Sequence, residues 1–126
     1  MDDFDLLASS LRADARDLDG FFPALAARLE GAMPPGRARV RRKSKSLFNR
    51  EKVVHTIEVD MGDKTYACAR GGAGGVQASC RTVVRGIALS TQEMALDAWI
   101  DALSSDMATE AQASAEARER LERMLG

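Results

Sequence analysis

Apolar side chains in the first third of the chain recur every three or four residues. The positions that follow this spacing are Phe4, Leu7, Leu11, Asp14 and Leu18. Such a stripe lies on one face of a helix, so it predicts an amphipathic helix that packs on a core. We expect this helix to stop at Gly20, and Pro23 to open a second short helix that ends at Gly31. Residues 1–33 are therefore predicted to be helical, as two helices or one kinked rod.

The middle of the chain alternates between apolar and polar residues, which is typical of half-buried strands. The strongest run, VVHTIEVDM, has an inward face and an outward face. The inward side chains are predicted to be Val53, His55, Ile57 and Val59, and the outward ones Val54, Thr56, Glu58 and Asp60. A two-residue turn at Gly62-Asp63 would place Ile57 opposite Cys68 and Val59 opposite Tyr66. Both pairs are apolar, so the register is self-consistent.

Three further strands are expected around this hairpin. One precedes it, with Ala38 and Val40 alternating with arginines, and one follows the turn through Cys68. A fourth begins at Val76, after the glycine-rich run RGGAGG. The segment from Thr82 to Leu89 either extends this fourth strand or forms a fifth.

The last third of the chain has a second apolar stripe at helical spacing. Its positions are Leu96, Ile100, Leu103, Met107, Ala111, Ser114, Arg118, Leu121 and Leu125. Ser90 and Glu93 fit a capping box, although the cap could equally lie a few residues later. Neither Pro nor Gly interrupts residues 87–125. We interpret this region as one long helix, or as two collinear pieces broken near Ser104-Ser105-Asp106. Its charged last turns are expected to project from the body and to offer a dimer contact.

These elements predict one α+β domain that spans residues 1–126. Residues 1–33 are helical, residues 37–89 form an antiparallel sheet and residues 90–126 are helical. The expected fold has two layers: an antiparallel β-meander of four to five strands, flanked by N-terminal helices and one long C-terminal helix. A chain of 126 residues has the length of a single domain with its own hydrophobic core.

The basic residues are concentrated in one short region, although the whole chain has a net charge of −1. Residues 37–52 contain one acid and the following eight bases: Arg37, Arg39, Arg41, Arg42, Lys43, Lys45, Arg50 and Lys52. Alternation places the first three on one strand face and the others around the following turn. Three explanations compete. The cations protect a sheet edge from aggregation, they contact the acidic helices of this or another subunit, or they bind an external anion.

Other residues carry weaker signals of chemistry. The glycines of RGGAGG lie between two strands, whereas a phosphate-binding loop leads into a helix, so we expect a hairpin tip. Cys68 and Cys80 would face each other if that hairpin centres on residue 74. Two buried thiols are the favoured interpretation, ahead of a disulfide or a metal pair. His55, the sole histidine, is expected to be a core residue. No catalytic residue, metal or cofactor is predicted.

Composition favours a cytoplasmic protein. The acidic residues Asp2, Asp3 and Asp5 are unlike the basic start of a secretory signal, and no apolar run approaches the roughly eighteen residues of a membrane span. The abundance of Ala, Arg and Gly suggests a bacterial source. The helix–sheet–helix layout loosely resembles small bacterial secretion-chaperone and adaptor domains, without a shared motif.

The leading functional hypothesis is a non-enzymatic adaptor or chaperone-like protein. It would be a homodimer that binds a protein partner through the basic hairpin from Arg37 to Lys52. Two alternatives remain open. One is a nucleic-acid-associated dimer that binds phosphates, although Phe48 is the one aromatic residue near the cations. The other is a small enzyme with a site near His55.

Overall fold

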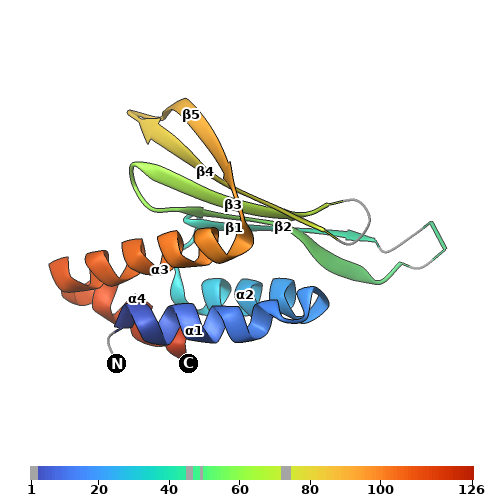
Figure 1. Ribbon diagram of the computed structural model, residues 1–126, viewed down its shortest axis with the longest axis horizontal. Coiled ribbons are helices and arrows are strands. Elements are labelled where there is room, and N and C mark those ends of the chain that lie inside the picture. Colours follow the sequence, from blue (N-terminus) through green and yellow to red (C-terminus); the bar gives the residue numbers. More distant parts are fainter. Residues whose placement is uncertain (1–2, 45–46, 49, 72–74) are drawn as a thin grey trace.

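The computed structural model describes residues 3–44, 47–48, 50–71 and 75–126. Four helices and five strands follow one another along the chain (Figure 1). They are α1 (Asp3–Ala15), α2 (Leu18–Ala32), β1 (Ala38–Ser44), β2 (Lys52–Asp60), β3 (Lys64–Arg70), β4 (Val76–Val84), β5 (Ile87–Met94), α3 (Leu96–Ala113) and α4 (Ala115–Leu125).

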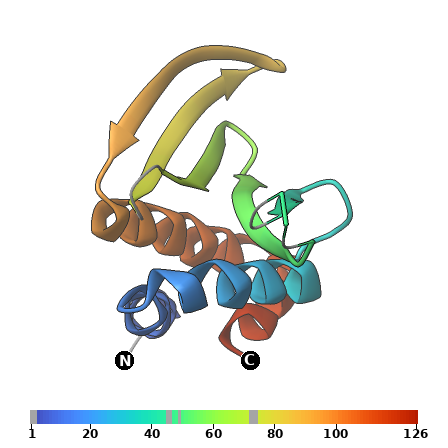
Figure 2. The same cartoon turned by 90° about the vertical axis from the view of Figure 1, so that its right-hand side faces the viewer.

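The strands form one antiparallel sheet in the order β1-β2-β3-β4-β5. The helices gather on one face of this sheet, and β4 and β5 curve away from them (Figures 1 and 2). Helix α2 packs against β1 and β2, helix α3 packs against β4, and α1 and α4 pack along both of these helices. The predicted two-layer α+β fold, with N-terminal and C-terminal helices around a β-meander, is confirmed.

The register predicted for the β2–β3 hairpin is also confirmed. Ile57 lies opposite Cys68 and Val59 opposite Tyr66, and all four side chains are buried. The turn closes through a hydrogen bond from the Met61 N–H to the Lys64 carbonyl oxygen, with an N–O distance of 2.8 Å. Apolar pairing across the strands and a tight turn therefore favour the same register.

The predicted capping box at Ser90 and Glu93 is wrong, because both residues lie in strand β5. The chain reverses at Arg85-Gly86, where both residues have positive φ angles (53° and 79°). These angles are typical of the tight turn that matches the twist of a hairpin. The turn directs residues 87–94 back along β4, so Glu93 pairs with Ser79. The sheet therefore extends to Met94, and the following helix begins at Leu96.

The predicted single C-terminal helix is wrong, because the helix breaks at Ser114. The Ser114 backbone is extended (φ −151°, ψ 150°), and its side chain accepts a hydrogen bond from the Ala117 N–H, which caps α4. Helix α4 folds back beside α2 and α3 instead of projecting from the body (Figure 1). Its apolar side chains Ala117, Leu121 and Met124 are buried within the same chain, so this stripe packs on the protein's own helices.

The N-terminal boundaries also differ from the prediction. Helix α1 ends at Ala15, and Asp17 caps α2 by accepting a hydrogen bond from the Asp19 N–H. Gly20 therefore lies within α2 and does not stop a helix. A Cβ atom at Gly20 would come within 3.3 Å of the Asp17 carboxylate, so the glycine leaves room for the cap. Pro23 lies inside α2 rather than at its first position.

A buried aromatic pair joins the sheet to α3. The rings of Tyr66 and Trp99 meet edge to face, with centroids 6.2 Å apart. The Trp99 indole N–H donates a hydrogen bond to the Ser79 carbonyl oxygen (3.1 Å), and the Tyr66 hydroxyl donates to the Asp106 carboxylate. The aromatic rings thus supply apolar burial, while their polar atoms fix α3 to β3 and β4.

We expect Tyr66→Phe to lower the free energy of unfolding by about 1.5 kcal/mol, because it removes a hydrogen bond to a charged group at a buried position. Urea unfolding followed by circular dichroism measures this change. Asp106→Asn is the matched variant, since it keeps an acceptor oxygen for the same hydroxyl and should cost less. Two variants as stable as the wild-type protein would show that this bond does not hold α3 on the sheet.

Candidate functional site

The basic hairpin, which we define as residues 37–52, contains a β-bulge in β2. Arg41 lies opposite Thr56 and Arg42 opposite Val54, so His55 has no residue across from it. The bulge reverses the alternation of β2 beyond this point. Val54 is therefore buried with Ile57, and the predicted inward placement of Val53 and His55 is wrong.

Three of the eight predicted site residues are paired within the chain. Arg39 donates to Glu58 (2.9 Å) and Asp60 (2.8 Å) across the open face of the sheet. This pairing lowers the pKa of Asp60 and raises that of Arg39. Arg42 donates to Glu30 of α2 (2.8 Å). Arg37 donates twice to the Asp60 carbonyl oxygen and lies 3.7 Å from Glu110 of α3.

The remaining described cations are exposed; Lys43, Arg50 and Lys52 lie farther along the hairpin, whereas Arg41 precedes Arg42 in β1. Arg41 and Lys43 lie in β1, Arg50 precedes β2, and Lys52 begins it. None of these four has an acidic partner among the residues that the structure describes. The prediction that Arg42, Lys43 and Lys52 lie around the turn is wrong, because all three belong to strands. Lys45 lies outside the described residues.

Two large apolar residues accompany these cations at the end of the hairpin. Leu47 is 96% exposed and Phe48 is 98% exposed. The hairpin reaches past the end of α2, so this part of it is not covered by the helical layer (Figure 1). We call Arg41, Lys43, Leu47, Phe48, Arg50 and Lys52 the hairpin tip. The hairpin tip therefore combines cations that form no ion pair in the described structure with two solvent-exposed apolar side chains.

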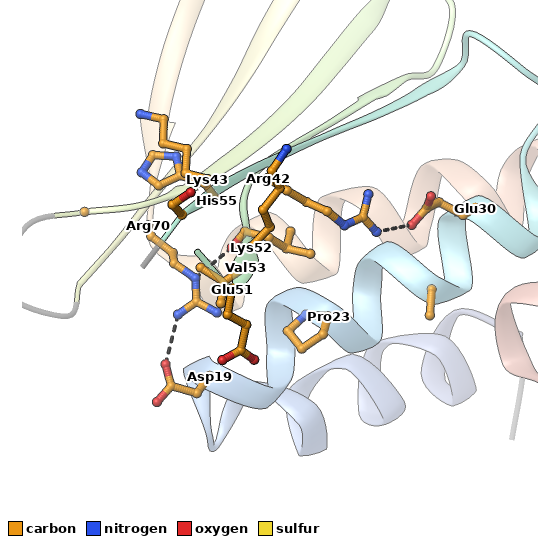
Figure 3. Close-up of a pocket in the computed structure, with 14 residues that line it drawn as sticks. Asp19, Pro23, Glu30, Arg42, Lys43, Glu51, Lys52, Val53, His55 and Arg70 are labelled. Carbon is orange, nitrogen blue, oxygen red and sulfur yellow. Dashed lines mark hydrogen bonds and ion pairs between the residues drawn. The ribbon is translucent and has the colours of Figure 1, made fainter. Parts of the chain in front are cut away.

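A cleft of about 810 Å³ separates the hairpin from α2. Two ion pairs cross it, Arg42 with Glu30 and Arg70 with Asp19 (2.9 Å) (Figure 3). Arg70 also donates to the Val54 carbonyl oxygen and lies over the Phe22 ring. These contacts fix the base of the hairpin to the helical layer, while Lys43 and Lys52 border the cleft without an acidic partner in the described structure.

His55 lines the same cleft beside Lys43 (Figure 3). Its ring Nδ1 lies 3.0 Å from the Thr56 hydroxyl oxygen. Partial burial lowers the pKa of His55, and the charges of Lys43 and Arg70 lower it further. A catalytic base oriented by a carboxylate would have its pKa raised by that partner. Among the described residues no carboxylate contributes to the shift of the His55 pKa.

The two cysteines are free thiols. Cys68 lies opposite Ala78, and Cys80 lies opposite Tyr66, so the predicted face-to-face arrangement is wrong and the two are diagonal neighbours. Burial raises the pKa of Cys68 to about 12 and also raises that of Cys80. Within the described residues no group of three His, Cys, Asp or Glu side chains is placed to hold a metal ion. The predicted glycine-rich turn between β3 and β4 falls on residues 72–74, which lie outside the described residues.

Comparison with protein-family models, with curated proteins and with solved structures finds no match. Among the described residues, no helix combines the length and the apolar character needed to cross a bilayer.

Sequence patterns could not separate the paired from the unpaired cations. Alternation along β1 correctly places Arg39 and Arg41 on one face, but the partners Glu58 and Glu30 come from other elements. The bulge at His55 has no sequence signal of its own. The sequence does show that Leu47 and Phe48 lie between cations, and the structure adds that both are exposed next to each other.

His55 offers a pH-dependent test of this geometry. Because its folded pKa is lowered, the neutral ring is favoured in the folded state. Its contribution to stability is complete above pH 6.5 and is lost as the pH falls below this value towards the folded pKa. We expect NMR titration of this single histidine to give a pKa below 6.5, and Lys43→Ala to raise it.

Arg41→Ala is the control variant for this titration, because it removes a cation from the same strand that does not contribute to the shift. An unshifted His55, or equal effects of the two variants, would contradict the placement of His55 beside Lys43.

Proposed function

We propose that this protein is a non-enzymatic adaptor or chaperone-like protein that binds an acidic protein partner through the hairpin tip. The observation that carries the proposal is the division of the basic hairpin. Arg39 and Arg42 are neutralised by Glu58, Asp60 and Glu30, whereas four other cations have no acidic partner in the described structure: Arg41, Lys43, Arg50 and Lys52. The candidate site therefore contains only part of the cations from Arg37 to Lys52, namely those without an acidic partner.

The apolar side chains at the tip favour a protein over other anions. Protein interfaces combine an apolar centre, often aromatic, with a charged rim. Leu47 and Phe48 would occupy a pocket on the partner, and Arg41, Lys43, Arg50 and Lys52 would meet its acidic rim. Complementary rim charge speeds association and rejects basic partners.

Nucleic acid is the second candidate, supported by the position of Phe48 among the cations. An exposed aromatic ring next to basic residues is able to stack on an unpaired base. A single ring provides one stacking contact, and the helical layer carries many acids that repel phosphate. We rank this candidate below protein binding. As a further part of the proposal, the protein is a homodimer in the bacterial cytoplasm.

The triple variant Lys43→Glu/Arg50→Glu/Lys52→Glu tests the proposal. Tagged wild-type and variant proteins are used to capture partners from nuclease-treated lysate of the source cells, and recovery is quantified by mass spectrometry. We expect the variant to lose the proteins that the wild type enriches, by about tenfold or more, because attraction at the rim becomes repulsion.

Arg16→Glu/Arg118→Glu/Arg123→Glu is the matched control. It makes the same change in net charge at exposed positions on the helical layer and should leave capture unchanged. Equal recovery by the wild type and the tip variant would contradict the proposal. Partners that disappear from the wild type on nuclease treatment would favour the nucleic-acid candidate instead.

A further inference from the structure

Four methionines line one small cavity where the helical layer meets the turn between β2 and β3. They come from four separate elements: Met33 caps the end of α2, Met61 directly follows β2, Met107 lies in α3 and Met124 lies in α4. Three of them are buried, with Met61 and Met107 each 6% exposed, and Met33 is half-buried. Four of the six methionines of the chain therefore surround a space of about 10 Å³.

Core packing alone does not account for this cavity. Methionine has an unbranched, flexible side chain that adapts its shape to fill irregular gaps. Protein interiors leave few voids, so four such side chains around one space would be expected to close it. The remaining space is about the size of one small occupant. The arrangement therefore indicates a binding site as well as a packed core.

The side chains around the cavity favour a soft metal ion as its occupant. Thioether sulfur is a soft, neutral ligand that selects Cu(I) over hard cations such as Mg²⁺ or Ca²⁺. Structural Zn²⁺ sites use thiolate and imidazole ligands, and among the described residues neither Cys nor His lines this cavity. Besides the methionines, the described lining residues are Ala117, Leu121, Glu110 and Arg120.

The charges beside the cavity favour a monovalent ion over a divalent one. The Glu110 carboxylate lies 3.9 Å from Arg120 and 3.7 Å from Arg37. Both N–O distances are longer than a hydrogen bond, so the carboxylate keeps acceptor capacity for a further cation. A buried cation needs such an opposite charge nearby. Because Arg120 also lines the cavity, a divalent ion would meet more repulsion there than a monovalent one.

We propose that this cavity is a Cu(I) site whose thioether ligands are Met33, Met61, Met107 and Met124. These residues are far apart in the sequence, so the unfolded chain has no such site and the bound ion stabilises the folded state. The ion joins α4 to α3 and to the ends of α2 and β2. The inference does not rest on the proposed function, since it involves none of the hairpin-tip residues.

NMR of the methionine methyl groups tests the inference. Protein labelled with ¹³C at these methyl groups is titrated, without oxygen, with Cu(I) in dilute acetonitrile, which holds the metal weakly. Cu(I) is diamagnetic, so bound signals shift without being lost. We expect the signals of the four cavity methionines to shift together until saturation. The signal of Met94, which lies in β5 and does not line the cavity, should stay in place. Equal shifts at Met94, or unshifted cavity methionines, would overturn the inference.

Matched leucine variants separate the ligand role of these methionines from their packing role. Met33→Leu/Met107→Leu keeps the apolar volume but removes two sulfur atoms, so its dissociation constant for Cu(I) should rise about tenfold or more. Met94→Leu is the matched control, because it makes the same change at a half-buried position outside the cavity, and should bind as tightly as the wild type. Circular dichroism verifies that both variants are folded. Equal affinities of the two variants would contradict the proposed ligands.

The thiols of Cys68 and Cys80 are the competing site for a soft metal ion, since thiolate sulfur also selects Cu(I). Cys68→Ala/Cys80→Ala removes both thiols and leaves the methionine cavity intact. We expect this variant to bind Cu(I) as tightly as the wild-type protein and to show the same methionine shifts. Loss of Cu(I) binding in this variant would assign the metal to the thiols and overturn the inference.

Discussion

The β-bulge at His55 determines how the basic hairpin is divided between structure and surface. Because β2 gains one residue at this point, Val54 turns to the helical layer beside Arg42. Arg42 then reaches Glu30, and the Val54 carbonyl oxygen receives the Arg70 side chain. The base of the hairpin is thus fixed to α2. Beyond the bulge, Lys43 and Lys52 form no ion pair with a described residue.

The three explanations for the concentrated charge apply to different cations of the hairpin. Arg37 and Arg42 contact acidic helices of the same chain, as the second explanation requires. The cations of β1 also guard a sheet edge, as the first explanation requires. Neither edge protection nor pairing with the chain's own acids explains Lys43, Arg50 and Lys52. These cations accompany the exposed apolar residues Leu47 and Phe48, which edge protection does not need. That combination is the physical basis of the proposed binding surface.

The sequence predicts the parts of this fold that depend on local pattern. The register of Ile57 with Cys68 follows from alternation and a tight turn, and the buried faces of α1 and α3 follow from three-four spacing. The predictions are wrong where contacts with residues distant in the sequence determine the secondary structure. Residues 90–94 are predicted to be helical but belong to β5, because pairing with β4 does not appear in their own pattern. The break at Ser114 has only a weak local signal, and it forms because α4 buries Leu121 and Met124 against other helices.

The two ends of the sheet have opposite chemistry. The β1 end is cationic and carries Leu47 and Phe48, whereas β5 has Glu93 as its one charged residue.

Site-specific photo-cross-linking at Leu47 tests the central claim most directly. A photoreactive phenylalanine analogue replaces Leu47 in one protein and the exposed Leu6 of α1 in another, and both are irradiated in cells of the source organism. The account predicts discrete protein adducts at position 47 that are absent at position 6 and resist nuclease. Identical adduct patterns at the two positions, or adducts at position 47 made of nucleic acid, would contradict it.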